Sequence, residues 1–264
     1  MRKEKTKEEI IRHANACIGK LNSLFQSYTI TEDPKLLKKA DLLSYWLEQF
    51  SDYIMEEDNF NPTALKSYKR GDIVKLNFGF NVGSEYGGLH YGVVINNSNP
   101  HNSKVLTVIP LTSYKQGQEI HHDDVFLGNE LYKLLKLKHD TLSQSINAEL
   151  KEAAQFQQIM MFMDNMLQKS SQEVKDVNAL MELKRKLKSQ HEKTLSDKQQ
   201  LDKIGKEISH MKSGSIAIAS SIMTVSKMRI YDPRNARGVL HGIRLSADSM
   251  NTINEKMKEL FIFS

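Results

Sequence analysis

The sequence predicts an α+β protein in which a compact β unit is built from two separated segments, with a long helical segment between them. Six of the thirteen glycines lie between Gly71 and Gly92. No glycine occurs between Gly128 and Gly205, and no proline between Pro110 and Pro233. Because both residue types interrupt helices, the glycine cluster predicts turns and strands, whereas the middle of the chain predicts long helix.

Residues 1–57 predict two helices that precede the β unit. Apolar residues recur at helical spacing from Ile10 to Phe25 and again from Leu36 to Ile54. Asp33 followed by Pro34 is typical of a helix start, with an N-cap carboxylate and proline in the first turn. Cys17 falls on the first apolar stripe, so we expect a buried thiol. Trp46 falls on the second, where we expect an aromatic anchor between the helices.

Three strands are predicted between Lys69 and Ser113, in the stretches DIVKLNFGF, HYGVVIN and VLTVIPLTS. The glycine-rich GFNVGSEYGG between the first two predicts a mobile or tightly turned hairpin loop. Strand character returns in SIAIASSIMTVS and in GVLHGIRLS. Ser246 is then expected to cap a closing helix.

The segment from about Leu131 to Met211 has helical apolar spacing throughout. A single helix of that length would extend on the order of 120 Å, far beyond what a small sheet can cover. We therefore expect it to fold back as a hairpin near residues 168–172, or to pair with a second chain as a coiled coil.

Composition excludes several classes of protein. The single cysteine excludes a disulfide scaffold, and no apolar stretch approaches the roughly 18 residues of a membrane span. The charged N-terminus lacks the apolar region of a secretory signal, so we expect a cytoplasmic protein without a membrane partner. The net charge of +5 permits a polyanionic partner without requiring one.

Four elements in the first β segment resemble the MazF/PemK family of toxins from bacterial toxin–antitoxin pairs. They are Arg70-Gly71-Asp72-Ile73, Gly83-Ser84-Glu85-Tyr86-Gly87-Gly88, Val93-Val94-Ile95 and Pro110-Leu111-Thr112-Ser113, in the family's order and spacing. SSIMTVSKMRIYDP is similar to the family's second block. The resemblance covers about 110 residues, and the N-terminal pair and the insertion lie outside it.

The resemblance implies a small SH3-like β-barrel formed by residues 68–128 and 213–264, behind an N-terminal helical region at 1–57 and interrupted by a helical insertion at 129–212. It further implies a homodimer, an antitoxin protein as a possible partner, and an endoribonuclease that cuts single-stranded RNA without a metal or other cofactor. Such an enzyme turns the RNA 2′-OH onto the adjacent phosphate and leaves a 2′,3′-cyclic phosphate.

The resemblance assigns catalytic roles to a few positions. The family's threonine or serine at the end of the third strand corresponds to Thr112, whereas the position of its arginine is occupied by His90 and that of the following proline by Tyr91. Histidine can move a proton near neutrality but is a weaker phosphate clamp. Arg229 is therefore the candidate cation. The alternatives are an RNA-contacting or structural His90, a turn-capping Thr112 and an Arg229 in a surface ion pair.

Further residues are candidates for RNA contact. The cations that flank the predicted strands could neutralise phosphates, and unpaired bases could stack on aromatic rings. Ser84 and Glu85 serve either this contact or the stability of the loop. The set comprises Lys69, Arg70, Ser84, Glu85, Tyr86, Tyr91, Lys115 and Arg234.

No metal site is predicted, because the adjacent residues of His121-His122-Asp123-Asp124 cannot easily converge on one ion. No P-loop, dinucleotide fingerprint or serine-hydrolase elbow is present. The alternative to a ribonuclease is a non-catalytic module that binds nucleic acid or protein and uses the helical insertion for interaction. We expect the insertion to be a dimerisation arm rather than a cover over the site, because residues 151–212 are net basic and would not compete with phosphate.

Overall fold

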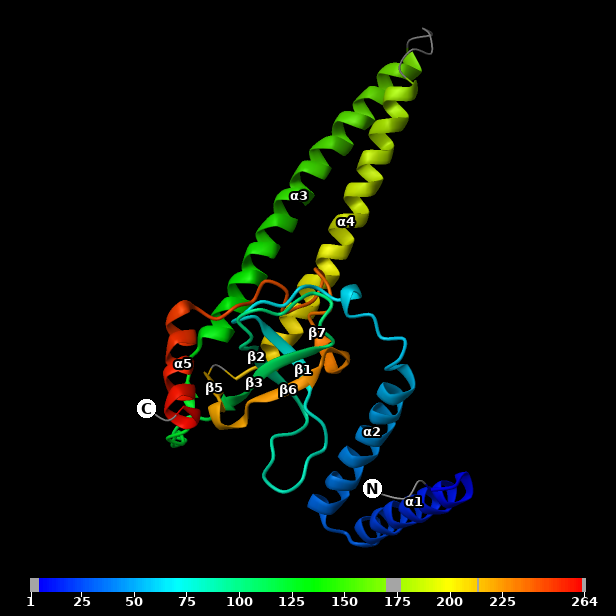
Figure 1. Ribbon diagram of the computed structural model, residues 1–264. Coiled ribbons are helices and arrows are strands. Elements are labelled where there is room, and N and C mark those ends of the chain that lie inside the picture. The colour runs from blue at the N-terminus through cyan, green and yellow to red at the C-terminus, as the bar shows by residue number, and fades with distance from the viewer. Residues whose placement is uncertain (1–4, 170–176, 213, 263–264) are drawn as a thin grey trace. The chain divides into compact units, whose positions relative to one another are not determined.

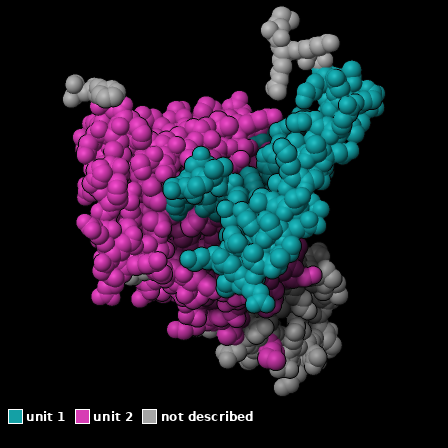
Figure 2. Space-filling model, turned by 90° about the horizontal axis from the view of Figure 1, so that it is seen from below, with its two compact units in different colours: residues 1–60, 79–88 teal, residues 61–78, 89–264 magenta. Residues whose placement is uncertain are grey.

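The computed structural model describes residues 5–169, 177–212 and 214–262 (Figure 1). The chain divides into two compact units, one of residues 1–60 with 79–88 and one of residues 61–78 with 89–264 (Figure 2). The loop between the first two strands thus groups with the N-terminal helices rather than with the sheet.

The first unit contains the two predicted helices, α1 (Lys7–Ile30) and α2 (Pro34–Glu56). Thr6 and Glu9 form a capping box at the start of α1, and the Asp33 carboxylate accepts a hydrogen bond from the Lys35 backbone at the start of α2, as predicted. Cys17 is exposed, so the expectation of a buried thiol is wrong. Within this unit α2 packs against α1, and one helix cannot cover the whole apolar stripe.

Trp46 organises the aromatic part of this unit. Its ring centroid lies 5.7 Å from that of Phe50 and 6.4 Å from that of Tyr53, both also on α2. Gly79, with φ of +100°, leaves space for the indole, because a Cβ there would lie 3.1 Å from Trp46 Cζ2. Trp46 therefore packs against residues of its own helix and beside one end of the 79–88 loop, and an anchor between the two helices stays a prediction.

The second unit contains a seven-stranded antiparallel sheet. Its path is β4-β5-β3-β2-β1-β7, with β6 paired to β3. β3 is central because its first half pairs with β6 and its second half with β5, while β2 lies along its other edge. The strands are β1 (Ile73–Asn77), β2 (Leu89–Val94), β3 (Val105–Tyr114), β4 (Val125–Phe126), β5 (Gly214–Ala217), β6 (Met223–Ser226) and β7 (Ile230–Asp232).

The sheet confirms the α+β class and the three predicted strands between Lys69 and Ser113. A closed barrel is not confirmed, because the pairings among the described residues leave the sheet open, with β4 and β7 at the two ends of its path. The strand predicted in GVLHGIRLS is wrong: this stretch contributes one isolated bridge, between Asp72 and Arg244. The closing helix α5 (Ala247–Phe261) begins at its Ser246 cap, as predicted.

Both faces of the sheet are buried, which is why its strands carry long apolar runs. One face holds Ile73, Val93 and Ile109, which join the main core cluster. The alternate residues point to the opposite face, where Val74, Leu76 and Val108 are fully buried.

The predicted insertion forms two helices, α3 (Glu130–Lys169) and α4 (Val177–His210), which lie side by side (Figure 1). Across them, Glu149 accepts hydrogen bonds from Lys193 at 2.6 Å and from Thr194 at 3.0 Å. The hydrogen bond from Lys193 lowers the pKa of Glu149. The turn expected near residues 168–172 falls largely outside the described residues.

The base of this hairpin belongs to the core of the sheet. Leu131 and Leu135 of α3 and Ile204 of α4 are fully buried in the main cluster. In the described part of the chain, no helix is long and apolar enough to cross a membrane.

Asp72 connects the start of β1 to distant parts of the second unit. Only 2% exposed, its carboxylate accepts hydrogen bonds from Lys66 Nζ at 2.8 Å, from the Lys69 backbone at 3.1 Å, and from Arg244 Nε and Nη2 at 2.8 and 2.7 Å. Burial alone would raise the pKa of Asp72, but these hydrogen bonds outweigh it, so the pKa lies below its ordinary value.

We predict that Asp72→Asn lowers the free energy of unfolding by about 3 kcal/mol, because it leaves Lys66 and Arg244 around a neutral group. Denaturant unfolding at pH 7 measures this. Because the pKa of Asp72 is lower in the folded state than in the unfolded state, ionised Asp72 contributes its full stabilisation above the unfolded-state pKa of about 3.9. This stabilisation is lost as the pH falls through the folded-state pKa. Glu255→Gln, in the exposed pair with Lys258, is the control and should change stability by less than about 0.5 kcal/mol. Equal effects of the two substitutions would contradict the role of Asp72.

Candidate functional site

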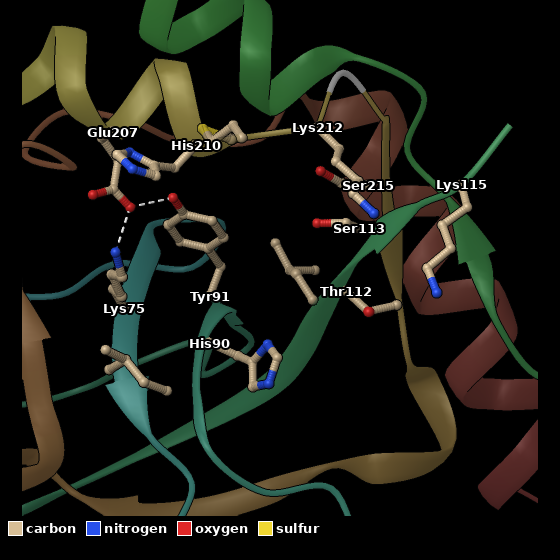
Figure 3. A pocket seen from close by; sticks show the side chains of 13 residues that line it. Lys75, His90, Tyr91, Thr112, Ser113, Lys115, Glu207, His210, Lys212 and Ser215 are labelled. Carbon is tan, nitrogen blue, oxygen red and sulfur yellow. Dashed lines mark hydrogen bonds and ion pairs between the residues drawn. The ribbon is translucent and has the colours of Figure 1, made fainter. Parts of the chain in front are cut away.

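A cleft of about 290 Å³ lies where the sheet meets the end of α4 (Figure 3). Strands β1, β2, β3 and β5 supply one side, and the last turn of α4 with the residues after it supplies the other. Its lining residues are Lys75, Leu89, His90, Tyr91, Leu111, Thr112, Ser113, Lys115, Glu207, His210, Met211, Lys212 and Ser215.

Glu207 fixes α4 to the sheet at this cleft. Its Oε1 accepts hydrogen bonds from Lys75 Nζ at 2.5 Å and from the Tyr91 hydroxyl (Figure 3). Lys75 and Tyr91 are register partners on β1 and β2, and the Lys75 ammonium lies 5.5 Å from the centroid of the Tyr91 ring. Burial and the hydrogen bond to Glu207 raise the pKa of Tyr91, so its phenol remains a donor at neutral pH.

His90 and Thr112 come from neighbouring strands of the same sheet. Tyr91 pairs with Leu111, so the next step of this antiparallel register places His90 beside Thr112. Because side chains alternate along a strand, His90 and Thr112 share one face, and Tyr91 points to the other. Figure 3 shows this difference: the Tyr91 ring points toward Glu207, and the His90 ring points away from it.

His90 is exposed to solvent on part of its surface, and protein atoms cover the rest. Desolvation lowers the pKa of His90 below its ordinary value of 6.5. At neutral pH the imidazole is therefore mainly neutral, which suits the acceptance of a proton more than its donation.

Arg229 lies at the end of the 3₁₀ turn Lys227–Arg229, immediately before β7. Its Nη1 donates a hydrogen bond to the Phe78 carbonyl at 3.3 Å, just beyond the end of β1. The next residue, Ile230, pairs with Leu76, which in turn pairs with His90. With β1 between them, Ile230 and His90 lie about 10 Å apart at ordinary strand spacing. Arg229 is not among the residues that line the cleft.

The predicted RNA-contacting residues of the second unit have different environments. Lys115 lines the cleft, and so does Tyr91, whose hydroxyl is engaged by Glu207. Arg70 donates hydrogen bonds to the Ile95 carbonyl and to Asn254 Oδ1, which gives it a structural role. Lys69 and Arg234 are exposed and lie outside the cleft lining.

Ser84, Glu85 and Tyr86 belong to the first unit. Glu85 Oε2 accepts a hydrogen bond from the Val82 backbone at 3.1 Å, and the Tyr86 carbonyl accepts one from Asn81 Nδ2 at 2.6 Å. These contacts within the loop favour the loop-stabilising interpretation of Glu85 that the sequence left open.

One cluster has ligand atoms that could approach a metal ion. Atoms of His121, His122 and Asp123 lie within 4.8 Å of one another, closer than their adjacency in sequence suggested. Both histidine side chains are well exposed, and His122 Nε2 lies 2.8 Å from Asp123 Oδ1. A surface contact between His122 and Asp123 accounts for this arrangement. None of the three residues lines the cleft.

Sequence reasoning missed the polar cleft residues that come from the insertion and from β5, and also one residue each of β1 and β3. One signal was available: Glu207 falls between Ile204, Ile208 and Met211 on the apolar face of α4, where a carboxylate needs a partner. The missed residues are Lys75, Ser113, Glu207, His210, Lys212 and Ser215.

Residues 69–155 match the family model described as PemK-like, MazF-like toxin of type II toxin–antitoxin system. The matched range contains β1 to β4 and the first part of α3, and with them His90 and Thr112. The resemblance to this family is therefore confirmed. Residues 213–264 lie outside the matched range, although β5 and β6 pair with β3 of the matched segment. A comparison with the curated proteins finds no match.

We predict that Tyr91→Phe lowers the free energy of unfolding by about 1.5 kcal/mol, because it removes a hydrogen bond to a charged carboxylate. Denaturant unfolding measures the change. Tyr231→Phe is the control, since Tyr231 is 67% exposed and its hydroxyl has no partner in the described part of the chain. Unchanged stability in Tyr91→Phe would mean that the contact with Glu207 contributes nothing in solution.

Proposed function

We propose that the protein is a PemK/MazF-like toxin that cleaves single-stranded RNA without a metal ion. The observation that carries the proposal is the pairing of His90 with Thr112: both lie in the segment that matches the toxin family, on neighbouring strands, and both line one cleft. A histidine and a hydroxyl beside a basic cleft suit transesterification at an RNA phosphate.

The proposed reaction begins at the ribose 2′-OH. His90 takes the 2′-OH proton while the 2′-oxygen attacks the adjacent phosphorus. The bond from phosphorus to the 5′-oxygen then breaks, that oxygen takes up a proton from solvent, and His90 releases the proton it accepted to solvent. The products are a 2′,3′-cyclic phosphate and a 5′-OH, so the atoms balance without a water molecule or a cofactor.

Charge on the phosphorane needs donors in fixed positions. The Thr112 hydroxyl is one such donor, since it makes no hydrogen bond within the described residues. Among the cations that line the cleft, Lys115 is the nearest to Thr112 in the sequence. Its ammonium has no acidic partner in the described chain. Arg229 lies across β1 from His90. Its guanidinium would contact a phosphate there after turning away from the Phe78 carbonyl.

The partners follow from the same family. A type II toxin is held in check by an antitoxin protein, and we propose such a partner here together with a homodimer. The α3–α4 hairpin remains the candidate dimerisation arm. Its outer part could serve dimerisation only, whereas its base also has other roles. Its base carries Ile204 and Glu207, which serve the core and the cleft.

The second candidate is a non-catalytic module that binds RNA or protein. It is favoured by the replacement of the family's arginine with His90, because a mainly neutral imidazole does not clamp a phosphate permanently.

We predict that His90→Ala lowers RNA cleavage at least about 100-fold, the range of general acid–base catalysis. Labelled RNA incubated in EDTA, with analysis for cyclic-phosphate ends, measures this. His90→Arg should retain RNA affinity, because it restores a phosphate-binding cation. Because the pKa of His90 is lowered, wild-type cleavage should rise with pH and reach its plateau with a midpoint below 6.5. A His90→Ala variant as active as wild type would remove this residue from the mechanism, and no cleavage by wild type would leave the binding module.

We predict that RNA affinity falls as salt rises, with a slope of about −0.7 per phosphate contact in a plot of log affinity against log salt concentration. Fluorescence anisotropy of a labelled single-stranded RNA between about 50 and 200 mM salt measures the slope. A protein target in place of RNA would give no measurable RNA binding or a slope near zero.

A further inference from the structure

Two hydroxyls face the cleft without partners. Ser113 and Ser215 are register partners on β3 and β5, and Figure 3 shows their hydroxyl oxygens pointing into the cleft on the same side. Ser215 is only 7% exposed, and its backbone N–H and carbonyl are engaged by Gly128 and Leu127. Neither hydroxyl has a hydrogen-bond partner among the residues that the structure describes. Ser113 is exposed and the Ser215 residue reaches the cleft, so both hydroxyls are available to a polar ligand that enters it.

The cleft is also positively charged. Three lysines and one carboxylate line it, and that carboxylate, on Glu207, is already paired with Lys75 and Tyr91. The ammonium groups of Lys115 and Lys212 have no acidic partner in the described chain. With the histidines neutral, the lining carries a net charge of +2, which favours an anion.

One feature opposes an anion here: the C-terminal end of α4 carries about half a negative charge on its unpaired carbonyls. Two of these carbonyls are satisfied, because the His210 ring nitrogen Nδ1 lies 2.6 Å from the Lys206 carbonyl and the Met211 backbone donates to Ile208. The remaining helix charge is smaller than that of the two unpaired lysines, so the balance stays positive.

We propose that Ser113, Ser215 and Lys212 form a subsite for a phosphate of the bound RNA other than the one that is cut. The inference rests on the proposed function for its ligand, and it adds that the inserted arm supplies part of the RNA-binding surface. Ser113 and Ser215 lie on the face opposite to His90 and Thr112. A phosphate held there touches no reacting atom, so the subsite positions the substrate and acts on KM more than on kcat.

The test uses an RNA with 2′-fluoro riboses, which lacks the attacking 2′-OH and so measures binding alone. Lys212→Ala should weaken its binding about fivefold or more and reduce the salt slope by about 0.7, the value for one lost contact to single-stranded RNA. Ser215→Ala should weaken binding without changing the slope, because it removes no charge. Lys212→Arg should restore both values.

Lys203→Ala is the matched control, because Lys203 is an exposed lysine of α4 outside the cleft. Lys212→Ala indistinguishable from Lys203→Ala would overturn the subsite. The subsite and the cleavage activity are tested separately: wild type that binds the 2′-fluoro RNA but does not cut natural RNA would reject the ribonuclease and keep the subsite. On a cleavable RNA, Lys212→Ala should raise KM with little change in kcat, and a loss confined to kcat would contradict a positioning role.

Discussion

The buried carboxylate of Asp72 is the constraint on which the second unit depends. It joins the segment before β1 to Arg244, 172 residues later in the chain, through hydrogen bonds that leave little room for another arrangement. In the sequence this residue stands within an apparent surface motif of charges, Lys69-Arg70-Gly71-Asp72. In the fold it lies in the interior, and Gly71 beside it has φ of +83°, which favours glycine. Within this motif, Asp72 and Arg70 therefore stabilise the fold.

A comparable contact, at Glu207, determines how the insertion relates to the site. An inserted hairpin can be a separate element attached through its two ends, but here the base of α4 packs in the core and its carboxylate pairs with two strands of the sheet. The arm and the cleft consequently share residues. The helical insertion thus forms part of the cleft wall, together with the sheet.

Local patterns in the sequence predicted most of the elements but not how they meet. Helical spacing identified α1 to α5, and alternation with branched residues identified β1 to β3, because these signals depend only on neighbours along the chain. The stretch around Arg244 was misread as a strand, since its apolar residues pack as a loop beside β1. Lys212 and Ser215 were missed, because their position in the cleft arises only when β5 pairs with β3 across the long insertion. Of the predicted site, His90, Tyr91, Thr112 and Lys115 come together at the cleft.

The α3–α4 hairpin has a mechanical consequence. A helix of 40 residues is about 60 Å long, and α3 has this length. Because the base of the hairpin packs in the core of the sheet, a tilt of about 5° at the base would move the far end of α3 by about 5 Å. The relation also works in reverse: a small force at the far end acts with a long lever on the Glu207 contact. A partner bound at the far ends of α3 and α4 would therefore exert its torque on the wall of the cleft.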